Sequence, residues 1–233
     1  MKHVLLILGT FLSLSTIAQT EDSLALSGES LDVFIPKGWN LLDSAAGDLN
    51  QDGIMDLVFA IQDTDSANIE LNDGLGSDTV DLNPRLLVIY FGTRQGDYER
   101  KFVSKEFIIL RDSPTMDEPF DGMYISKKGV LNIQFRFWYS AGSWYMSNHT
   151  YRFRFQNEEF ALIGYDSMEA HRASGETTDY SINFLTKKLK ISKGNFSNDE
   201  PSSVEWKSFK LEKLFTMKSL GMPFNTSFEG VYL

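Results

Sequence analysis

The fold class is decided by the stretch Leu131-Asn132-Ile133-Gln134-Phe135-Arg136-Phe137-Trp138-Tyr139, followed by Tyr151-Arg152-Phe153-Arg154-Phe155. In both segments the odd-numbered residues are apolar, which is typical of β-strands that bury one face. If the two strands form an antiparallel hairpin, directly paired residues must share that face, so their numbers must be both odd or both even. We therefore predict an odd-length loop or a bulge near Ala141-Gly142.

Further β-type runs lie on both sides of this hairpin. They are residues 57–61, 85–91, 102–110, 160–165, 180–184 and 189–191. Short turns rather than helices separate them, so the predicted fold is mainly β. We expect antiparallel sheets, as a sandwich or a partial propeller-like arrangement of two β units, with few short helices. Residues 63–83 lack periodicity and are predicted to be a loop, and residues 206–217 are assigned to a strand rather than a helix.

The candidate domain boundary is the acidic connection from Asp112 to Asp121, which contains Pro114 and Pro119. This connection predicts an N-terminal β unit at residues 19–111 and a C-terminal antiparallel β unit at residues 122–233. It could equally be a surface loop within one continuous domain.

The first 18 residues have the pattern of an export signal peptide. Lys2 precedes an apolar run at residues 4–14, and Thr16-Ile17-Ala18 resembles a cleavage site. The run is shorter than the roughly 20 residues that span a bilayer, and no later stretch is longer, so no transmembrane segment is expected. The mature chain should begin near Gln19 and be periplasmic or secreted.

Cysteine is absent from the chain, which excludes disulfides, thiolate metal sites and a cysteine nucleophile. For an exported protein this absence favours a bacterial origin. The 22 Lys and Arg residues are outnumbered by 32 Asp and Glu residues, which gives a net charge of −10. Because an acidic surface repels phosphate backbones, nucleic acid is not an expected partner.

The segment Asp48-Leu49-Asn50-Gln51-Asp52-Gly53-Ile54-Met55-Asp56 carries oxygen-bearing side chains at positions 1, 3, 5 and 9, and glycine at position 6. Ca²⁺ prefers six to eight oxygens at about 2.3–2.6 Å, which a tight loop of this spacing can supply. The alternative is an ordinary turn whose Asp and Asn side chains bond their own backbone. We predict a structural Ca²⁺ site whose ligands are Asp48, Asn50, Asp52, Asp56 and the backbone carbonyl of Ile54.

The stretch from Gly47 to Val58 resembles the FG-GAP or VCBS repeat, the calcium loop and strand of integrin-type β-propellers. Together with Ile35-Pro36-Lys37-Gly38-Trp39, it is also similar to small exported bacterial proteins that contain one such repeat. The resemblance implies calcium binding at the four matched side chains. A second copy of the loop motif is absent, since Asn72-Asp73-Gly74 lacks the upstream acids, so a regular propeller is not expected.

Nine aromatic residues lie between Phe135 and Phe155. Most are expected to be sheet core and cross-strand pairs. Trp138 and Trp144 fall off the odd-numbered face near the turn, where they could form a platform for a carbohydrate or protein ligand. Arg136 and Arg152 would frame it, although such arginines can also simply pair with nearby acids.

No catalytic motif is evident in the sequence. His149 and His171 are isolated and do not form a zinc-binding pattern, and neither a Gly-x-Ser-x-Gly elbow nor a phosphate-binding loop is present. The expected function is therefore an exported, calcium-stabilised, β-rich binding or structural module. The alternative is a secreted or periplasmic hydrolase that acts on carbohydrate, with the calcium loop as scaffold. A pocket with two or three convergent carboxylates would favour the enzyme.

Overall fold

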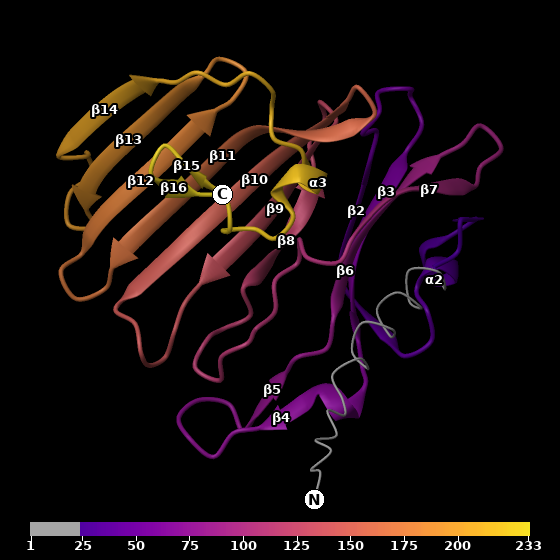
Figure 1. Cartoon of the computed structure of the whole chain (residues 1–233), viewed down its shortest axis with the longest axis horizontal. Helices are drawn as coiled ribbons and strands as arrows, with labels where there is room; N and C mark the ends of the chain where they lie inside the picture. Colours follow the sequence, from indigo (N-terminus) through magenta and orange to yellow (C-terminus); the bar gives the residue numbers. More distant parts are fainter. Residues whose placement is uncertain (1–23) are drawn as a thin grey trace, which may run out of the picture.

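The computed structural model describes residues 24–233, so the expected signal peptide at residues 1–18 lies outside the described residues. The chain is mainly β, with antiparallel sheets, which confirms the predicted fold class (Figure 1). Two helices, α2 (Leu31–Phe34) and α3 (Met217–Leu220), each have four residues. Within residues 24–233, no helix is long and apolar enough to cross a membrane.

The N-terminal half forms a five-stranded sheet. In spatial order its strands are β1 (Ser27–Gly28), β7 (Tyr98–Ser104), β6 (Arg85–Gly92), β3 (Asp56–Asp63) and β2 (Trp39–Gly47). The central strands β3 and β6 are buried along almost their whole length because both of their faces are covered. On one face Phe34 of α2 stacks on Tyr90, and the other face contributes to the main core. This explains why both strands read as continuous apolar runs.

The C-terminal half forms a seven-stranded meander. In spatial order its strands are β14 (Ser203–Ser208), β13 (Lys188–Asn195), β12 (Glu176–Asn183), β11 (Glu159–His171), β10 (Tyr145–Gln156), β9 (Val130–Phe137) and β8 (Phe120–Ile125). At one edge β8 lies against β2 of the other sheet. The C-terminal segment, with α3, β15 (Ser227–Phe228) and β16 (Val231–Tyr232), crosses one face of the sheet (Figure 1).

The β9–β10 hairpin has the predicted register. Leu131 pairs with Phe153 and Phe137 pairs with Ser147, so paired residues are either both odd-numbered or both even-numbered. Phe135 and Phe153 are both buried on the core side. The residues between the last pair, 138–146, are odd in number, as the shared apolar face requires.

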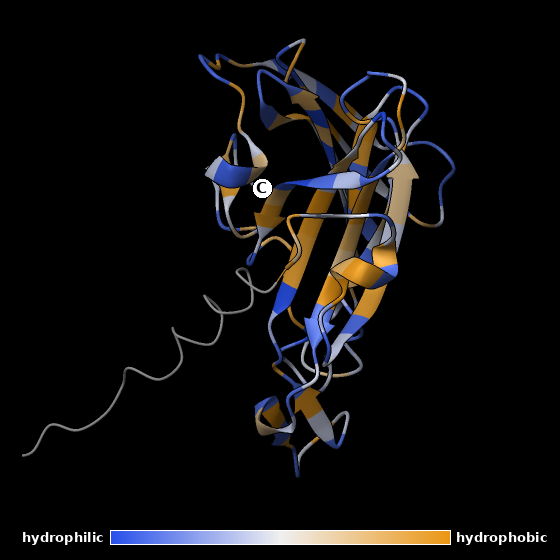
Figure 2. Ribbon diagram, turned by 90° about the vertical axis from the view of Figure 1, so that its right-hand side faces the viewer, coloured by the Kyte–Doolittle hydropathy of each residue, from blue (hydrophilic) through white to orange (hydrophobic). Residues whose placement is uncertain are grey.

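The two sheets share one hydrophobic core. Val58 and Ile89 of the five-stranded sheet belong to the same buried cluster as Leu131 and Tyr151 of the seven-stranded sheet, and Val231 of the C-terminal segment completes it. Figure 2 shows the central strands as mostly apolar ribbon and the loops as mostly polar ribbon. Beyond this core, the sheets diverge and leave space between them.

Residues 63–83, predicted to be a loop, instead contain η1 (Ser66–Asn68) and the short hairpin of β4 (Ile69–Leu71) and β5 (Thr79–Asp81). The buried side chain of Asn83 organises this segment. Its Oδ1 accepts hydrogen bonds from Asp65 N and Asn68 Nδ2, while its Nδ2 donates to Asp65 O. Because a polar network rather than an apolar face fixes this hairpin, hydrophobic periodicity could not reveal it.

Two other predicted strands end earlier than expected. Strand β7 stops at Ser104, and residues 105–110 continue without regular structure. Similarly, β14 stops at Ser208, and the chain then leads to α3. In both places buried apolar residues, such as Phe107 and Phe209, contact the core from irregular backbone. Their hydrophobicity therefore predicted a strand although no strand is present.

Candidate functional site

The Asp48–Asp56 segment connects β2 to β3 as a tight turn. Asp52 N donates to Asp48 Oδ1 (3.1 Å) and to Asn50 Oδ1 (3.0 Å), so both oxygens approach the same N–H group. Asp48 Oδ2 accepts from Gly53 N (2.9 Å), and Asp52 Oδ1 accepts from Ile54 N (2.8 Å). Gly53 has a φ of 87°, a left-handed conformation that favours glycine. The structure thus brings Asp48, Asn50 and Asp52 together.

Asp56, the last predicted ligand, lies at the base of the turn and is fully buried. Its Oδ2 accepts from Leu49 N (2.7 Å) and Asn50 N (3.3 Å), and its Oδ1 accepts from Gly92 N (3.0 Å). Burial raises the pKa of Asp56 above its ordinary value, although the three backbone hydrogen bonds act in the opposite direction. Asp56 therefore anchors the loop to the end of β6.

Ca²⁺ requires several oxygen ligands that converge on one point. The side chains at the turn and the Ile54 carbonyl offer oxygen donors only, which suits a hard cation. Asp56 already uses both oxygens for backbone N–H groups, and within residues 24–233 no cluster of three or more His, Cys, Asp or Glu side chains is arranged for a metal. The oxygen donors of the turn are of the type that Ca²⁺ prefers. Asp56 also holds the turn in place through its hydrogen bonds to backbone N–H groups.

Both tryptophans of the β9–β10 hairpin contact Arg172, which lies in the turn that follows β11. The Arg172 guanidinium lies 4.8 Å from the ring centroid of Trp138, and its backbone N–H donates to Trp144 O (2.8 Å). The Trp144 side chain is 65% exposed. Arg136 pairs with Asp117 (3.5 Å) and Arg152 pairs with Asp166. The structure therefore brings the two tryptophans to one tip, whereas each of the two arginines is paired with a carboxylate.

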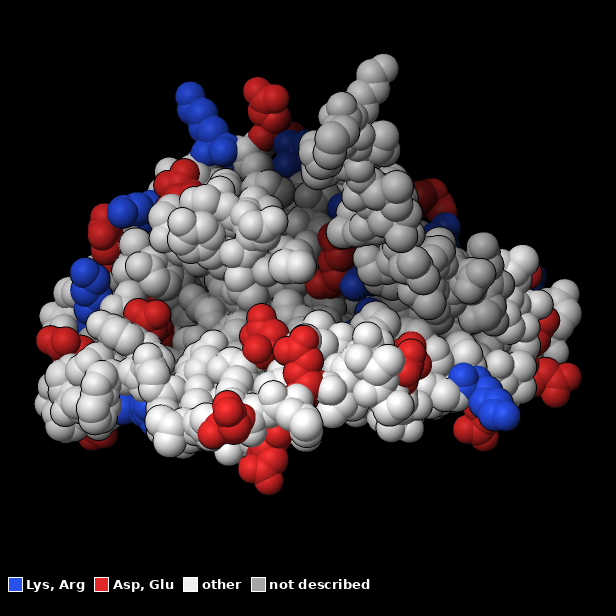
Figure 3. Space-filling view, turned by 60° about the horizontal axis from the view of Figure 1, so that its bottom comes forward, with Lys and Arg blue, Asp and Glu red and all other residues white. Residues whose placement is uncertain are grey.

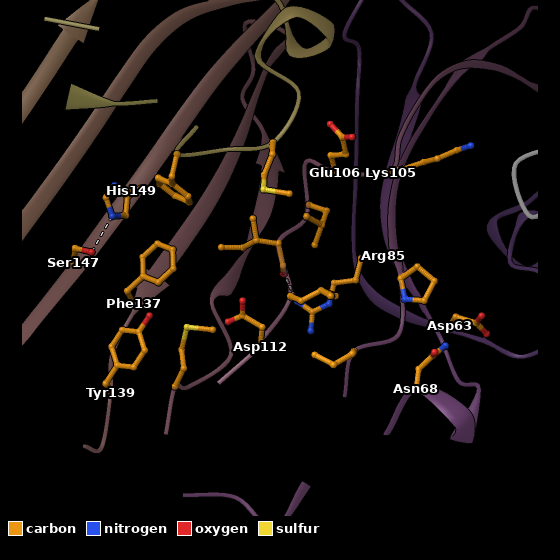
Figure 4. Close-up of a pocket in the computed structure, with 18 of the residues that line it drawn as sticks. Asp63, Asn68, Arg85, Lys105, Glu106, Asp112, Phe137, Tyr139, Ser147 and His149 are labelled. Atoms are coloured by element: carbon orange, nitrogen blue, oxygen red, sulfur yellow. Dashed lines mark hydrogen bonds between the residues drawn. The ribbon is translucent and has the colours of Figure 1, made fainter. Parts of the chain in front are cut away.

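A cleft of about 960 Å³ opens where the two sheets diverge (Figure 4). It lies between the start of β6, the irregular segment after β7, the ends of β9 and β10, and the C-terminal segment. Much of its wall is apolar and includes Ile108, Leu110, Met116, Phe137, Met222 and Phe224. The cleft is thus formed by segments that are far apart in the sequence.

The charged residues at the cleft are mostly acidic. They are Asp63, Asp65, Arg85, Lys105, Glu106 and Asp112. The buried Arg85 guanidinium makes a bidentate pair with Glu118 (2.6 and 2.8 Å) and also donates to Ile109 O (2.8 Å), so its charge is already balanced. Figure 3 shows Asp and Glu side chains across the lower middle of the face that it presents, with Lys and Arg side chains mainly toward its sides. The net charge at the cleft is therefore negative.

One polar network interrupts the apolar wall, and it is centred on His149. Nδ1 of His149 lies 2.7 Å from the Tyr165 hydroxyl oxygen, which is 3.2 Å from the Tyr232 carbonyl oxygen. Because a carbonyl oxygen can only accept, the Tyr165 hydroxyl donates its proton to Tyr232 O. The Tyr165 oxygen must therefore accept from His149, so Nδ1 carries the imidazole proton. We therefore assign Nε2 as the acceptor for the Ser147 hydroxyl, 2.9 Å away (Figure 4).

The surroundings of His149 keep it uncharged. Its ring contacts Phe137 (5.5 Å between centroids) and Phe224 (4.7 Å). This burial lowers the pKa of His149 from 6.5 to about 4. Nearby, burial and then the charge of Asp112 raise the pKa of Tyr139. At neutral pH the cleft wall thus offers a neutral imidazole and two hydroxyls as hydrogen-bonding groups.

The loop is visible in the sequence, whereas the cleft is not. His149 is isolated in the sequence, because its partners Tyr165 and Tyr232 are distant from it along the chain. The only available signal was the odd-numbered position of Ser147 and His149, which puts them on the core face of β10. Comparison with known proteins finds no matching family model, no matching curated protein and no matching solved structure.

Proposed function

We propose that this protein binds a small, largely apolar molecule in the cleft between its two sheets. The observation that carries the proposal is the cleft itself, about 960 Å³ with an apolar and aromatic wall and one embedded polar network. Ligand sites typically have volumes of about 300–1,000 Å³, apolar walls and a few placed polar groups. An apolar surface that is left open to solvent in a cleft often marks a ligand-binding site.

The charges at the cleft restrict the class of ligand. Four carboxylates surround it, whereas Arg85 is balanced by Glu118 and only Lys105 adds a further positive charge. An anionic ligand would be repelled, so the ligand should be neutral or cationic. The Ser147 hydroxyl and Tyr139 hydroxyl are placed to hydrogen-bond a polar group at one end of it.

Two fluorescent probes test this proposal. N-Phenyl-1-naphthylamine is neutral, and 8-anilino-1-naphthalenesulfonate has the same rings with an added sulfonate. We expect one molecule of the neutral probe to bind per chain, about tenfold more tightly than the anionic probe, which corresponds to roughly 1.4 kcal/mol. Failure of both probes to saturate would contradict binding in the cleft. Tighter binding of the anionic probe would contradict the charge argument.

We further propose that the Asp48–Asp56 segment is a single calcium-loop repeat that stabilises the exported, mature protein. Its oxygen donors and its resemblance to FG-GAP or VCBS loops support Asp48, Asn50, Asp52 and the Ile54 carbonyl as ligands, with Asp56 as the fifth. A bound cation would offset the negative charge of a buried Asp56, which lies near Asp52.

Thermal melts test the calcium proposal. Ligand that binds only the native state stabilises it by about 2.7 kcal/mol at a hundredfold excess over Kd. Melts in millimolar CaCl₂ and in EGTA should therefore differ by several degrees, and Asp52→Asn should reduce the difference. Identical melts, together with no heat of calcium binding in calorimetry, would contradict the proposal.

A hydrolase is the second candidate function. The observation that favours it is the Ser147 hydroxyl beside the unprotonated Nε2 of His149, since a nucleophilic serine needs such a base. Ester hydrolysis suits this pair better than glycoside cleavage, which uses two carboxylates. The pKa of about 4 makes His149 a weak base at neutral pH, so this candidate ranks second.

A fluorophosphonate probe separates the two candidates. If the serine is activated, its oxygen attacks phosphorus, its proton passes to His149 Nε2 and fluoride leaves. Intact-mass analysis then shows one added phosphonyl group. Ser147→Ala should abolish this labelling, and Ser143→Ala, on the same hairpin outside the cleft, should not. No labelling of the wild-type protein would rule out an activated Ser147.

A further inference from the structure

Strand β14 is a free edge of the seven-stranded sheet. It pairs only with β13, and all six of its residues are exposed, including Val204 (47%) and Trp206 (63%). Within residues 24–233, most other strands that pair with one neighbour are only two or three residues long. The longer ones, β2 and β8, lie against each other. An exposed edge presents N–H and C=O groups that can pair with another strand.

We propose that β14 pairs antiparallel with β14 of a second copy of this chain, which joins two seven-stranded sheets into one. The two-fold axis of such a pair is perpendicular to the sheet, so each face of one copy continues into the same face of the other. Directly opposite residues must then be both odd or both even in number. Near the middle of the strand, either Glu205 or Trp206 must lie opposite its own copy.

Charge distinguishes these two registers. If Glu205 lay opposite the partner's Glu205, two carboxylates would face each other, which destabilises a strand pair. If Trp206 lies opposite the partner's Trp206, Glu205 faces the partner's Lys207, and symmetry makes this contact twice. Within one chain, Lys207 Nζ already lies 3.4 Å from Glu205 Oε1, so the two side chains share a face. The register centred on Trp206 is therefore favoured.

The same register gives the exposed tryptophan a partner. Cross-strand aromatic pairs add to the stability of a sheet, and two Trp206 rings would meet on the axis. A lysine on an edge strand usually prevents unwanted pairing. Here Lys207 would oppose pairing with most strands but would favour a strand that offers a carboxylate at the matching position, as a second β14 does.

Single cysteines test the register directly, because the chain has no native cysteine. Directly paired residues have Cα atoms about 4.5–5.5 Å apart, within the usual disulfide range. In the full-length mature protein, Trp206→Cys should therefore form a disulfide-linked dimer on air oxidation. Glu205→Cys, offset by two residues from its own copy, should cross-link far less. Equal or greater cross-linking of Glu205→Cys, or none in either variant, would overturn the proposal.

Charge reversal tests the pairing without a covalent bond. Sedimentation velocity of the wild-type protein should show a dimer whose fraction increases with concentration. Lys207→Glu should decrease the dimer fraction, and Glu205→Lys combined with Lys207→Glu should restore it, because the double change exchanges the two charges. All of these side chains are exposed, so the fold should be retained, which circular dichroism can verify. A wild-type monomer at all concentrations, or no difference between the variants, would contradict the proposal.

Discussion

The Asp48–Asp56 loop and the cleft use polar groups in different ways. In the loop, residues close in sequence bond each other, and the buried Asp56 accepts three backbone hydrogen bonds. In the cleft, His149 takes part in one polar network within an apolar wall built from distant segments. The loop therefore contributes to holding the fold together, whereas the cleft leaves apolar surface open. Changes in the loop should mainly alter stability, and changes at the exposed apolar residues of the cleft should mainly alter binding.

The largest expected effect is on stability and concerns Asp56. Asp56→Asn replaces an acceptor oxygen with an N–H₂ group that cannot accept from the backbone, so at least one buried N–H loses its partner. We expect a loss of about 3 kcal/mol in the free energy of unfolding, measured by urea denaturation in EGTA. Asp52→Asn, at the exposed turn, is the matched control and should cost less than about 1 kcal/mol. Equal losses of stability for the two variants would contradict the conclusion that Asp56 anchors the loop more strongly than Asp52 does.

A second effect on stability, of similar size, is expected from the pH dependence of His149. Its pKa is 6.5 when unfolded and about 4 when folded, so the unfolded chain binds a proton that the native state does not. The native state should lose up to about 3 kcal/mol as the pH falls from 6.5 to 4. His149→Gln should remove this part of the pH dependence, measured by urea denaturation at several pH values. Parallel curves for the two proteins would show that His149 is not held neutral by burial.

The hairpin tip offers an intermediate case, because Trp138 and Trp144 differ in exposure. Trp138 lies under the Arg172 guanidinium, and Trp144 is largely exposed. Trp138→Ala should lower the free energy of unfolding by about 1–2 kcal/mol through lost packing and a lost cation–π contact. Trp144→Ala should change it by less than about 0.5 kcal/mol. If Trp144→Ala also abolished capture of a carbohydrate or protein ligand, the tip rather than the cleft would be the binding site.

The difference between the loop and the cleft also explains what the sequence could predict. The loop is a run of nine consecutive residues, so its spacing is visible without a structure. The hairpin register could be predicted because the apolar residues of both strands, such as Phe135 and Phe153, are odd-numbered and must share one face. Even so, the spacing did not reveal that Asp56 is an anchor, because its contact with Gly92 joins two strands.

The cleft could not be predicted in the same way. Its wall combines Arg85, Ile108, His149 and Phe224, which only the packing of the two sheets brings to one place. The apolar residues 107–110 resemble part of a strand in the sequence, although the chain leaves the sheet after Ser104 and residues 108–110 line the cleft instead. Side-chain burial is visible as hydrophobicity in a sequence, whereas unfilled space between elements has no local signal.

The central claim is that the cleft is the binding site, and two methionines of similar exposure test it most directly. Met222 lines the cleft and is 50% exposed, while Met55 lies in the Asp48–Asp56 segment and is 53% exposed. Titrations of N-phenyl-1-naphthylamine should give a Kd about fivefold weaker for Met222→Ala, since about 1 kcal/mol of apolar contact is lost. Met55→Ala should leave the Kd unchanged. Equal Kd values for both variants and the wild-type protein would contradict binding in the cleft.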